Sequence, residues 1–298
     1  MKPEKLVLAL LSFTTGFFVA VVFRRRKDRR NYTGWPVNVA HRGSSIVAPE
    51  NTLQSFQQAI DEGAVGLELD VHLSRDGEVV VIHDDTVDRT TDGSGLIREK
   101  LLSEITPLDA GYWFSRDGGY SHPYRGAGVK PPTLREVYWR FPEARVNAEI
   151  KGDVRGIEEA VLRVIEDAGA EGRTLVASQK HGVNKRFRQV SGEAIPTSAS
   201  QFEIGLFYWF SRLWIESLLK PAYTAIQIPR RHLGIELLTP RLVAAAHDRG
   251  VRIDVWTVDD PDEMNLVLDF GVDVIMTNRP RTLTEVLEQR CVGGGGSL

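Results

Sequence analysis

Three carboxylates stand inside two otherwise apolar stretches of this sequence. Glu68 and Asp70 are two residues apart in VGLELDV (65–71), and Glu149 lies in RVNAEIK (145–151). Residues two apart in a β-strand point to the same face, and carboxylates that face a core repel one another and lose hydration. A single acid of this kind is usually exposed or paired with arginine. Three of them on two strands instead predict a site for a hard divalent cation, Mg²⁺ or Ca²⁺.

Two histidines and two permanent cations occur near the same strand ends. His41 and His83 each end a short apolar run. A lone histidine in such a place is more often structural than catalytic, but two beside an acidic trio suit a general base and a general acid. Arg42 follows His41, and Lys151 shares the strand face of Glu149. Both cations are therefore placed to neutralise a phosphate.

These side chains need a scaffold that brings several strand ends together. Short apolar runs alternate with helical periods after residue 31, which is typical of an α/β protein with a parallel sheet. We predict a (β/α)8 TIM barrel. One of the nine candidate strands is surplus to such a barrel, or the 65–84 pair is irregular because its connection is too short for a helix. The candidates are 37–41, 65–71, 78–84, 145–151, 174–178, 195–199, 224–228, 252–257 and 272–277.

Capping residues and a long interruption mark the connections between these strands. A helix is expected at 51–63, with Asn51 able to cap it and Gly63 able to end it. Glu50 and Asn51 lie at its start, where capping is the simplest role, and Asn51 could also face the metal site. Further helices are expected near 239–249 and 260–270. Residues 85–130 are rich in Gly, Asp, Tyr and Arg and interrupt the alternation, so we predict an insertion that shapes a substrate site.

The N-terminus differs from the rest of the chain. Residues 6–23 are uncharged, span roughly 27 Å as a helix, and are followed by RRRKDRR at 24–30. A cleaved signal peptide is the alternative, but its apolar core is usually shorter and followed by small residues. We therefore predict a single-pass transmembrane helix within 1–30. The basic flank then places the catalytic domain in the cytoplasm.

Charge and composition define the remaining organisation. Residues 1–30 hold 8 of the 37 basic and 2 of the 40 acidic residues, so the rest of the chain carries a net charge of −9. A region this acidic is a poor nucleic-acid binder, and no nucleic-acid partner is expected. The single cysteine, Cys291, excludes an internal disulfide. We assign 31–290 to the barrel and the Gly-rich 291–298 to a flexible tail.

A series of motifs across residues 37–285 resembles the glycerophosphodiester phosphodiesterase family of the phospholipase-C-like barrels. The match is in family order and spacing. It comprises HRG (41–43), PENT (49–52), ELDV (68–71), HD (83–84), DRTT (88–91), LDAG (108–111), PPTLREV (131–137), AEIK (148–151), WTVD (256–259) and TNRP (277–280).

The resemblance implies both a fold and a set of residue roles. It implies an (α/β)8 barrel, with Arg42 and Lys151 near the phosphate and Trp256 lining the pocket. It also implies metal ligands at Glu68, Asp70 and Glu149, and an acid-base pair at His41 and His83. Two positions depart from the family pattern, because Asp259 stands where Asn is frequent and Asn278 where Asp is frequent. Neither departure touches the metal or acid-base set.

One further segment bears on the substrate. Residues 202–219 hold six of the 25 aromatic residues and only three charges. A core helix is one interpretation. The segment offers little polar face, however, and an interfacial segment that touches membrane lipid better explains Trp209 and Trp214. The layout is also similar to that of membrane-anchored family members that act as lysophospholipase D.

These observations predict a metal-dependent phosphodiesterase. The expected substrates are glycerophosphodiesters, which would yield glycerol 3-phosphate and an alcohol, or lysophospholipids, through lysophospholipase D action. A sphingolipid-directed phospholipase D-like enzyme is the alternative within enzymes. A non-catalytic lipid-headgroup binder is the alternative outside them, although the complete set of candidate catalytic residues argues against it.

Overall fold

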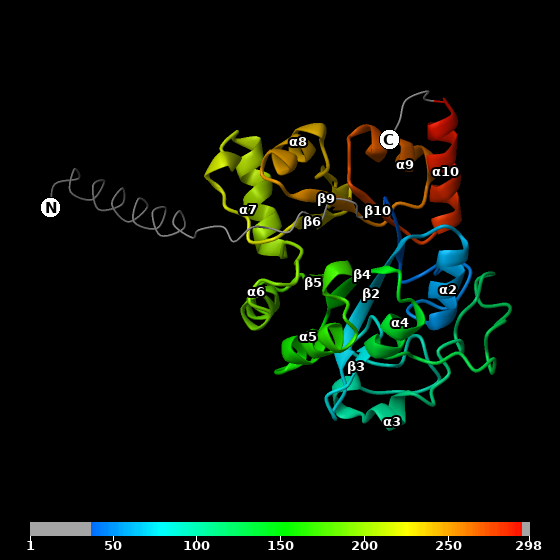
Figure 1. Ribbon diagram of the computed structural model, residues 1–298. Coiled ribbons are helices and arrows are strands. Elements are labelled where there is room, and N and C mark those ends of the chain that lie inside the picture. Colours follow the sequence, from blue (N-terminus) through cyan, green and yellow to red (C-terminus); the bar gives the residue numbers. More distant parts are fainter. Residues whose placement is uncertain (1–36, 294–298) are drawn as a thin grey trace.

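The computed structural model describes residues 37–293, and its centre is a ring of parallel strands surrounded by helices (Figure 1). Seven strands pair in the order β5-β4-β2-β1-β10-β9-β6, with parallel neighbours throughout. Their bounds are β1 (Asn38–His41), β2 (Gly66–Leu73), β4 (Arg145–Ile150), β5 (Thr174–Ala177), β6 (Ala225–Ile228), β9 (Arg252–Val255) and β10 (Val274–Thr277).

Residues 197–198 close this ring. Thr197 forms a parallel bridge with Val176 of β5, and Ser198 forms one with Ala225 of β6. Backbone hydrogen bonds support both sides, including Ser198 N to Val176 O at 3.0 Å. The segment therefore occupies the eighth parallel position, and the fold is the predicted TIM-type barrel.

The ninth candidate strand lies outside the barrel ring. β3 (Val79–Val81) pairs antiparallel with the end of β2. The turn between them is too short for the crossover that a parallel pair requires. The irregular 65–84 pair thus accounts for the surplus strand.

Helices connect consecutive strands and cover the outside of the ring. Their bounds are α2 (Leu53–Asp61), α4 (Leu134–Arg140), α5 (Ile157–Asp167), α6 (His181–Val190), α7 (Gln201–Arg212), α8 (Pro240–Asp248), α9 (Pro261–Asp269) and α10 (Pro280–Gly293). The expected helix at 51–63 is present, but the expected cap was wrong. Thr52 caps α2 by accepting a hydrogen bond from the Ser55 backbone, whereas Asn51 has a left-handed φ of 56°.

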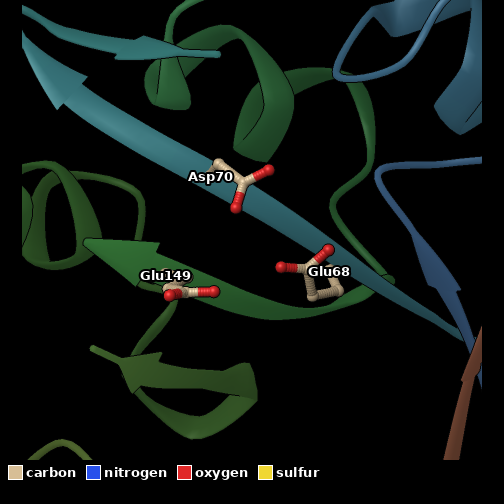
Figure 2. Close-up of side chains that lie close together, drawn as sticks. All are labelled: Glu68, Asp70 and Glu149. Atoms are coloured by element: carbon tan, nitrogen blue, oxygen red, sulfur yellow. The ribbon is translucent and has the colours of Figure 1, made fainter. Parts of the chain in front are cut away.

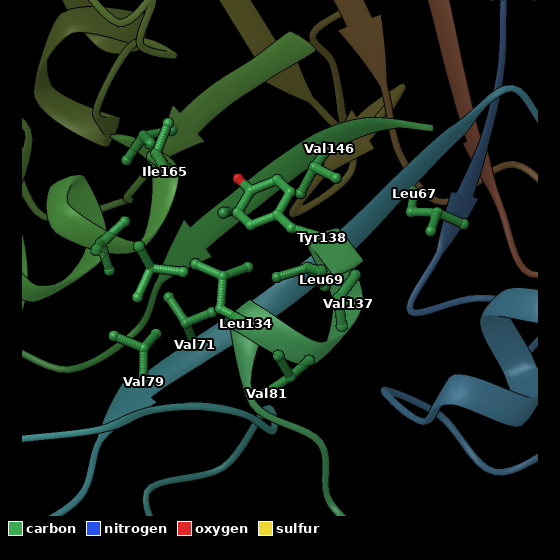
Figure 3. Packing of buried hydrophobic residues seen from close by; sticks show 14 of the residues in the cluster. Leu67, Leu69, Val71, Val79, Val81, Leu134, Val137, Tyr138, Val146 and Ile165 are labelled. Atoms are coloured by element: carbon green, nitrogen blue, oxygen red, sulfur yellow. The ribbon is translucent and has the colours of Figure 1, made fainter. Parts of the chain in front are cut away.

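Side-chain alternation along β2 separates the core from the site. Leu67, Leu69 and Val71 are fully buried and pack with Leu134 and Tyr138 of α4 (Figure 3). The residues between them, Glu68, Asp70 and His72, necessarily point to the opposite face. Hydrophobic packing on one face of β2 therefore sets the direction of the polar residues on the other.

The predicted insertion at 85–130 follows β3. It contains a 3₁₀ turn, η1 (Ile97–Glu99), and the short α3 (Leu102–Ile105), and is otherwise built from turns and irregular backbone. Ile97 and Ile105 are buried against Val80 and Ile82, which attaches the insertion to β3. A second excursion, the hairpin of β7 (Arg231–His232) and β8 (Ile235–Glu236), follows β6.

The predicted membrane anchor within 1–30 lies outside the described residues and stays a prediction. Within 37–293, none of the helices combines the length and the apolar composition that crossing a membrane requires. At the other end, α10 continues to Gly293, so the first residues of the predicted 291–298 tail belong to a helix.

Segment 202–219 has a buried side and an exposed side, and its expected contact with lipid stays a prediction. It forms α7 and the 3₁₀ turn η3 (Glu216–Leu218). Phe207 is completely buried in the core, while Trp209 is 62% exposed and Trp214 is 74% exposed. One side of α7 is thus barrel core, and the other side is an aromatic surface.

This division predicts different stability effects for neighbouring aromatic residues. Phe207→Ala should lower the free energy of unfolding by about 3–5 kcal/mol, because it leaves a cavity in a packed core. Trp209→Ala should change it by no more than about 0.5 kcal/mol, as is usual for a surface position. Chemical denaturation of both variants measures the difference. Equal losses would mean that both sides of α7 are packed.

Candidate active site

The site begins with a tight turn at the carboxyl end of β1. Arg42 and Gly43 have φ values of 57° and 85°, and a Cβ on Gly43 would lie 2.4 Å from Ser55 Oγ. Only glycine fits there without displacing α2. The turn directs the Arg42 backbone N–H at Glu68, whose carbonyl and side-chain oxygens accept it at 3.0 and 3.1 Å. The HRG motif thus joins β1 to the first of the three carboxylates.

Glu68, Asp70 and Glu149 converge at neighbouring strands (Figure 2). Asp70 of β2 is in parallel register with Glu149 of β4. One carboxylate oxygen from each of the three residues lies within 4.8 Å of the others. Glu68 and Asp70 are almost completely buried. The structure therefore brings together the trio that strand periodicity predicted.

The electrostatics of the trio show how strongly these charges compete. Burial raises the pKa of Glu68 well above its usual value, and repulsion from Asp70 and Glu149 raises it further. Burial also opposes ionisation of Asp70, but Lys151 and Arg42 outweigh it and hold the pKa of Asp70 below its usual value. Lys151 Nζ lies 3.0 Å from Asp70 Oδ1 and 2.8 Å from Glu149 Oε2.

The donor set fits a divalent cation. Asp70 Oδ1 is buried, and among the described residues it has an ion-pair neighbour in Lys151 but no hydrogen-bond partner. Hard carboxylate oxygens are the ligands that Mg²⁺ and Ca²⁺ prefer. The wider cluster also leaves charge to be balanced. When all groups are ionised, the five carboxylates and three cations of this cluster leave two negative charges. The carboxylates are Glu50, Glu68, Asp70, Asp84 and Glu149, and the cations are Arg42, Arg89 and Lys151.

His41 is oriented by a carboxamide. Asp259 can only accept hydrogen bonds, so the Asn278 Nδ2–H that contacts it at 2.8 Å fixes which way the amide points. Asn278 Oδ1 then faces His41 Nδ1 at 2.9 Å and accepts a hydrogen bond from it, so the expectation that position 278 does not touch the acid-base pair was wrong. His41 Nε2 is left on the side of Glu68, at 4.0 Å. Burial and the charge of Arg42 lower the pKa of His41, which favours the neutral imidazole.

His83 is oriented by a carboxylate. Its Nδ1 lies 2.6 Å from Asp84 Oδ1, so Nε2 is the nitrogen available for chemistry. Burial opposes ionisation of Asp84, but hydrogen bonds from Arg89 and His83 outweigh it and lower the pKa of Asp84 to about 2. The ionised carboxylate accepts a hydrogen bond from Nδ1 and so fixes the orientation of the His83 ring. The two histidines therefore differ in the chemistry of their partners.

Several residues of this network escaped the sequence interpretation. Glu50 binds Arg42 at 3.1 Å and Arg89 at 2.8 Å, although its expected role was limited to the start of a helix. Arg89 lies in the DRTT motif, which had no assigned role. Asn51 donates to Asp70 Oδ2 at 2.9 Å, as its suggested position near the metal site allowed. Arg89 and Glu50 together join the 85–130 insertion to the HRG turn.

The remaining candidate residue, Trp256, follows β9 at the same end of the barrel. It is partly buried and packs against the cluster that fills the barrel interior, which includes Val39, Ala177 and Met276. Its expected contact with substrate stays a prediction.

The structure thus brings together an acidic cluster that could hold a cation and two oriented imidazoles, an arrangement that suits a hydrolytic barrel enzyme. Residues 41–282 match the model of the glycerophosphoryl diester phosphodiesterase family, and the chain belongs to this family. The enzyme class predicted from the sequence, a phosphoric diester hydrolase, is thereby confirmed.

Individual relatives agree with this assignment. A glycerophosphodiester phosphodiesterase of Caldanaerobacter subterraneus subsp. tengcongensis is 36% identical over 84% of this chain and 97% of its own length. A phosphodiesterase of Oleispira antarctica, solved in complex with the product sn-glycerol-3-phosphate, superposes with a TM-score of 0.68 at 26% identity; the match covers 87% of this chain and 100% of that one. A lysophospholipase D of Rattus norvegicus is 24% identical over 93% of this chain and 92% of its own length.

The contact between Asp259 and Asn278 yields a prediction about His41. Asn278→Asp places two carboxylates against each other, and Asp259→Asn removes the acceptor that orients the amide. Each should lower kcat about tenfold with little change in KM, the effect of losing a hydrogen bond of about 1–1.5 kcal/mol. The double variant restores the same hydrogen bonds with the donor and acceptor residues exchanged.

Steady-state kinetics of both single variants and the double variant measure this coupling. The double variant should recover most of the wild-type kcat. If the two losses in kcat instead multiply in the double variant, the two residues act independently and the pair does not position His41.

Proposed function

We propose that this protein is a metal-dependent phosphodiesterase that hydrolyses glycerophosphodiesters to glycerol 3-phosphate and an alcohol. The observation that carries this proposal is the convergence of Glu68, Asp70 and Glu149 within 4.8 Å. The Oleispira relative was solved in complex with the product sn-glycerol-3-phosphate, which supports the choice of product.

Glu68, Asp70 and Glu149 would hold the divalent cation. When bound, such an ion polarises a phosphoryl oxygen and neutralises charge that develops in the transition state. Arg42 and Lys151 both lie against Asp70 and would hold the phosphodiester by its negative charge. Arg42 is kept in place from the other side by Glu50, at 3.1 Å.

The two histidines would divide the proton transfers. His41 is held neutral with Nε2 free, so it suits the base that takes a proton from the attacking water as the new O–P bond forms. His83 is held by Asp84 through Nδ1 with Nε2 free, and we assign it as the acid that protonates the alkoxide as the P–O bond to the alcohol breaks. One proton is taken and one is given, which leaves the pair ready to exchange them with solvent.

The histidine assignment predicts a selective loss of turnover. His41→Ala and His83→Ala should each lower kcat by roughly 10²–10⁴-fold with the fold intact. His247→Ala is the matched control, because His247 pairs with Asp273 away from the trio and should keep wild-type rates. Near wild-type turnover in both site variants would rule out this mechanism.

The cation assignment predicts a dependence on divalent ions. Glu68→Gln, Asp70→Asn and Glu149→Gln each remove a ligand charge, so activity should be lost and partly recovered in excess Mg²⁺ or Ca²⁺. Asp167→Asn, at an exposed ion pair with Arg135, should behave as wild type. Full activity of the wild-type protein after thorough treatment with EDTA would contradict a metal-dependent reaction.

Lysophospholipids are the second substrate class, because they contain the same glycerol phosphodiester. The aromatic surface of α7 and the similarity to a rat lysophospholipase D favour them. A panel of glycerophosphocholine, glycerophosphoethanolamine and lysophosphatidylcholine, run beside a sphingolipid and with products identified by mass, distinguishes the classes. Cleavage of a sphingolipid but of none of these would instead support a sphingolipid-directed enzyme, and cleavage of nothing would support a headgroup binder.

A further inference from the structure

An apolar stripe runs along the outer side of α7. Phe202, Leu206, Trp209 and Leu213 follow one another at helical spacing, so their side chains share one face of the helix. They are 65%, 39%, 62% and 64% exposed. Trp214 and Leu218, 74% and 50% exposed, continue the surface beyond the end of the helix. These six residues are called the α7 face below.

The barrel does not need the α7 face for its own packing. Phe207 and Ser211 are the buried residues of α7, and they lie on its other side. Isolated exposed apolar residues are normal on protein surfaces, but contiguous apolar surfaces of this kind mark contact with a membrane or a partner. The question is therefore what covers the α7 face.

The charges around the α7 face favour a lipid surface. Its two nearby acids are neutralised, because Glu203 pairs with Arg188 at 2.6 Å and Glu216 pairs with Arg241 at 2.7 Å. Arg241 also stacks on Trp214 with its guanidinium carbon 3.8 Å from the ring centroid. Arginine beside exposed tryptophan is the composition that binds the headgroup region of a bilayer.

A cavity beside the α7 face is also suited to a lipid headgroup. It has a volume of about 250 Å³ and is lined by Tyr208, Ser211, Arg212, Thr239, Arg241 and Leu242. Arg212 and the hydroxyl groups of Tyr208 and Thr239 suit the phosphate of a lipid headgroup. Arg241, by contrast, is already paired with Glu216. The positive charge of Arg212 contrasts with the net charge of −9 carried by residues 31–298.

The position of α7 relates this surface to the active site. Segment 197–198 runs parallel to β5 and β6, so α7 begins at the carboxyl ends of the strands, where the site lies. The β7–β8 hairpin leaves the adjacent strand β6 at the same end, and its Leu233 and Ile235 are 89% and 56% exposed. The start of α7 and the exposed tip of the hairpin thus lie at the same end of the barrel as the mouth of the site.

The chain outside the structure also points to a bilayer. The predicted anchor ends at residue 23, and residues 24–36 span on the order of 40 Å when extended before the barrel begins at Val37. That tether would keep every side of the barrel within reach of the membrane. The α7 face is the side whose chemistry matches it.

We propose that the α7 face docks the barrel side-on against the bilayer, with Trp209 and Trp214 in the headgroup region. This arrangement holds the mouth of the site beside the interface, where single-chain lipids enter from the membrane. Docking itself does not depend on the proposed function, whereas its benefit for lysophospholipid turnover rests on it.

The direct test measures the depth of two positions on the α7 face in the full chain. In a Cys291→Ser background, the variants Leu206→Cys, Leu213→Cys and Trp139→Cys each carry an environment-sensitive fluorophore in vesicles that contain phosphatidylcholine and phosphatidylserine. Trp139 is 82% exposed on α4, which packs against β2 on a different side of the barrel from α7 (Figure 1), so it is the matched control. Brominated lipids quench fluorophores that enter the bilayer.

The proposal predicts strong quenching at positions 206 and 213 and little at 139, although all three share one tether. Equal quenching at the three positions would contradict the proposal, because it would show that the barrel has no preferred orientation at the membrane. A blue-shifted emission at 206 and 213 that brominated lipid does not quench would also contradict it, since a second copy or another segment of the chain would then cover the face.

A kinetic test uses the triple variant Leu206→Ser, Trp209→Ser and Leu213→Ser, which spares the core residue Phe207. Turnover of lysophosphatidylcholine in vesicles should fall at least about tenfold, while turnover of soluble glycerophosphocholine and the melting temperature stay near wild type. Trp139→Ser should change neither rate. Equal loss toward both substrates would overturn the link to lipid access, and a wild-type protein that cleaves neither would overturn the proposed function while the quenching result still decides docking.

Discussion

Placing three carboxylates at the buried end of a parallel barrel is the constraint on which the rest of the structure depends. Glu68 and Asp70 are nearly inaccessible to water, and burial of such groups is costly unless opposite charge accompanies them. Lys151 and Arg42 supply part of that charge through contacts of 3.0 and 3.2 Å to Asp70. A bound divalent cation would provide the remainder, so it would be a structural as well as a chemical part of the site.

The residues around the trio also orient the two histidines. Asp259 and Asn278 orient His41, while Asp84 and Arg89 orient His83, and in both cases Nε2 is the nitrogen left free. The partners differ, because a neutral amide faces His41 and an ionised carboxylate faces His83. Both rings are held through Nδ1, and the hydrogen-bond partners fix which nitrogen faces the site.

The fold and the convergence of the three carboxylates could be predicted from the sequence because both depend on local periodicity. Alternation along β2 and β4 placed the three carboxylates on one face, and the strand-helix order indicated the barrel. The eighth strand position was harder to confirm, because its bridges involve only residues 197–198. The side chains that hold the candidate site residues in place were not predictable. For example, the hydrogen bond from Arg89 to Glu50 joins segments 39 positions apart. Asn51 resembled a helix cap, but its left-handed backbone turns its amide to Asp70 instead. The division of α7 into a core side and an exposed side needed the position of the helix against the barrel.

A divalent cation bound by the trio should relieve the repulsion between the buried carboxylates, and this effect can be measured without substrate. Thermal unfolding of the metal-stripped full chain, followed while Mg²⁺ or Ca²⁺ is titrated, measures that relief. We predict a saturable rise in melting temperature that reflects stabilisation of about 2.7 kcal/mol at one hundred times the dissociation constant, with the metal retained in elemental analysis of the purified protein. An unchanged melting temperature with both ions, together with no retained metal, would contradict the account.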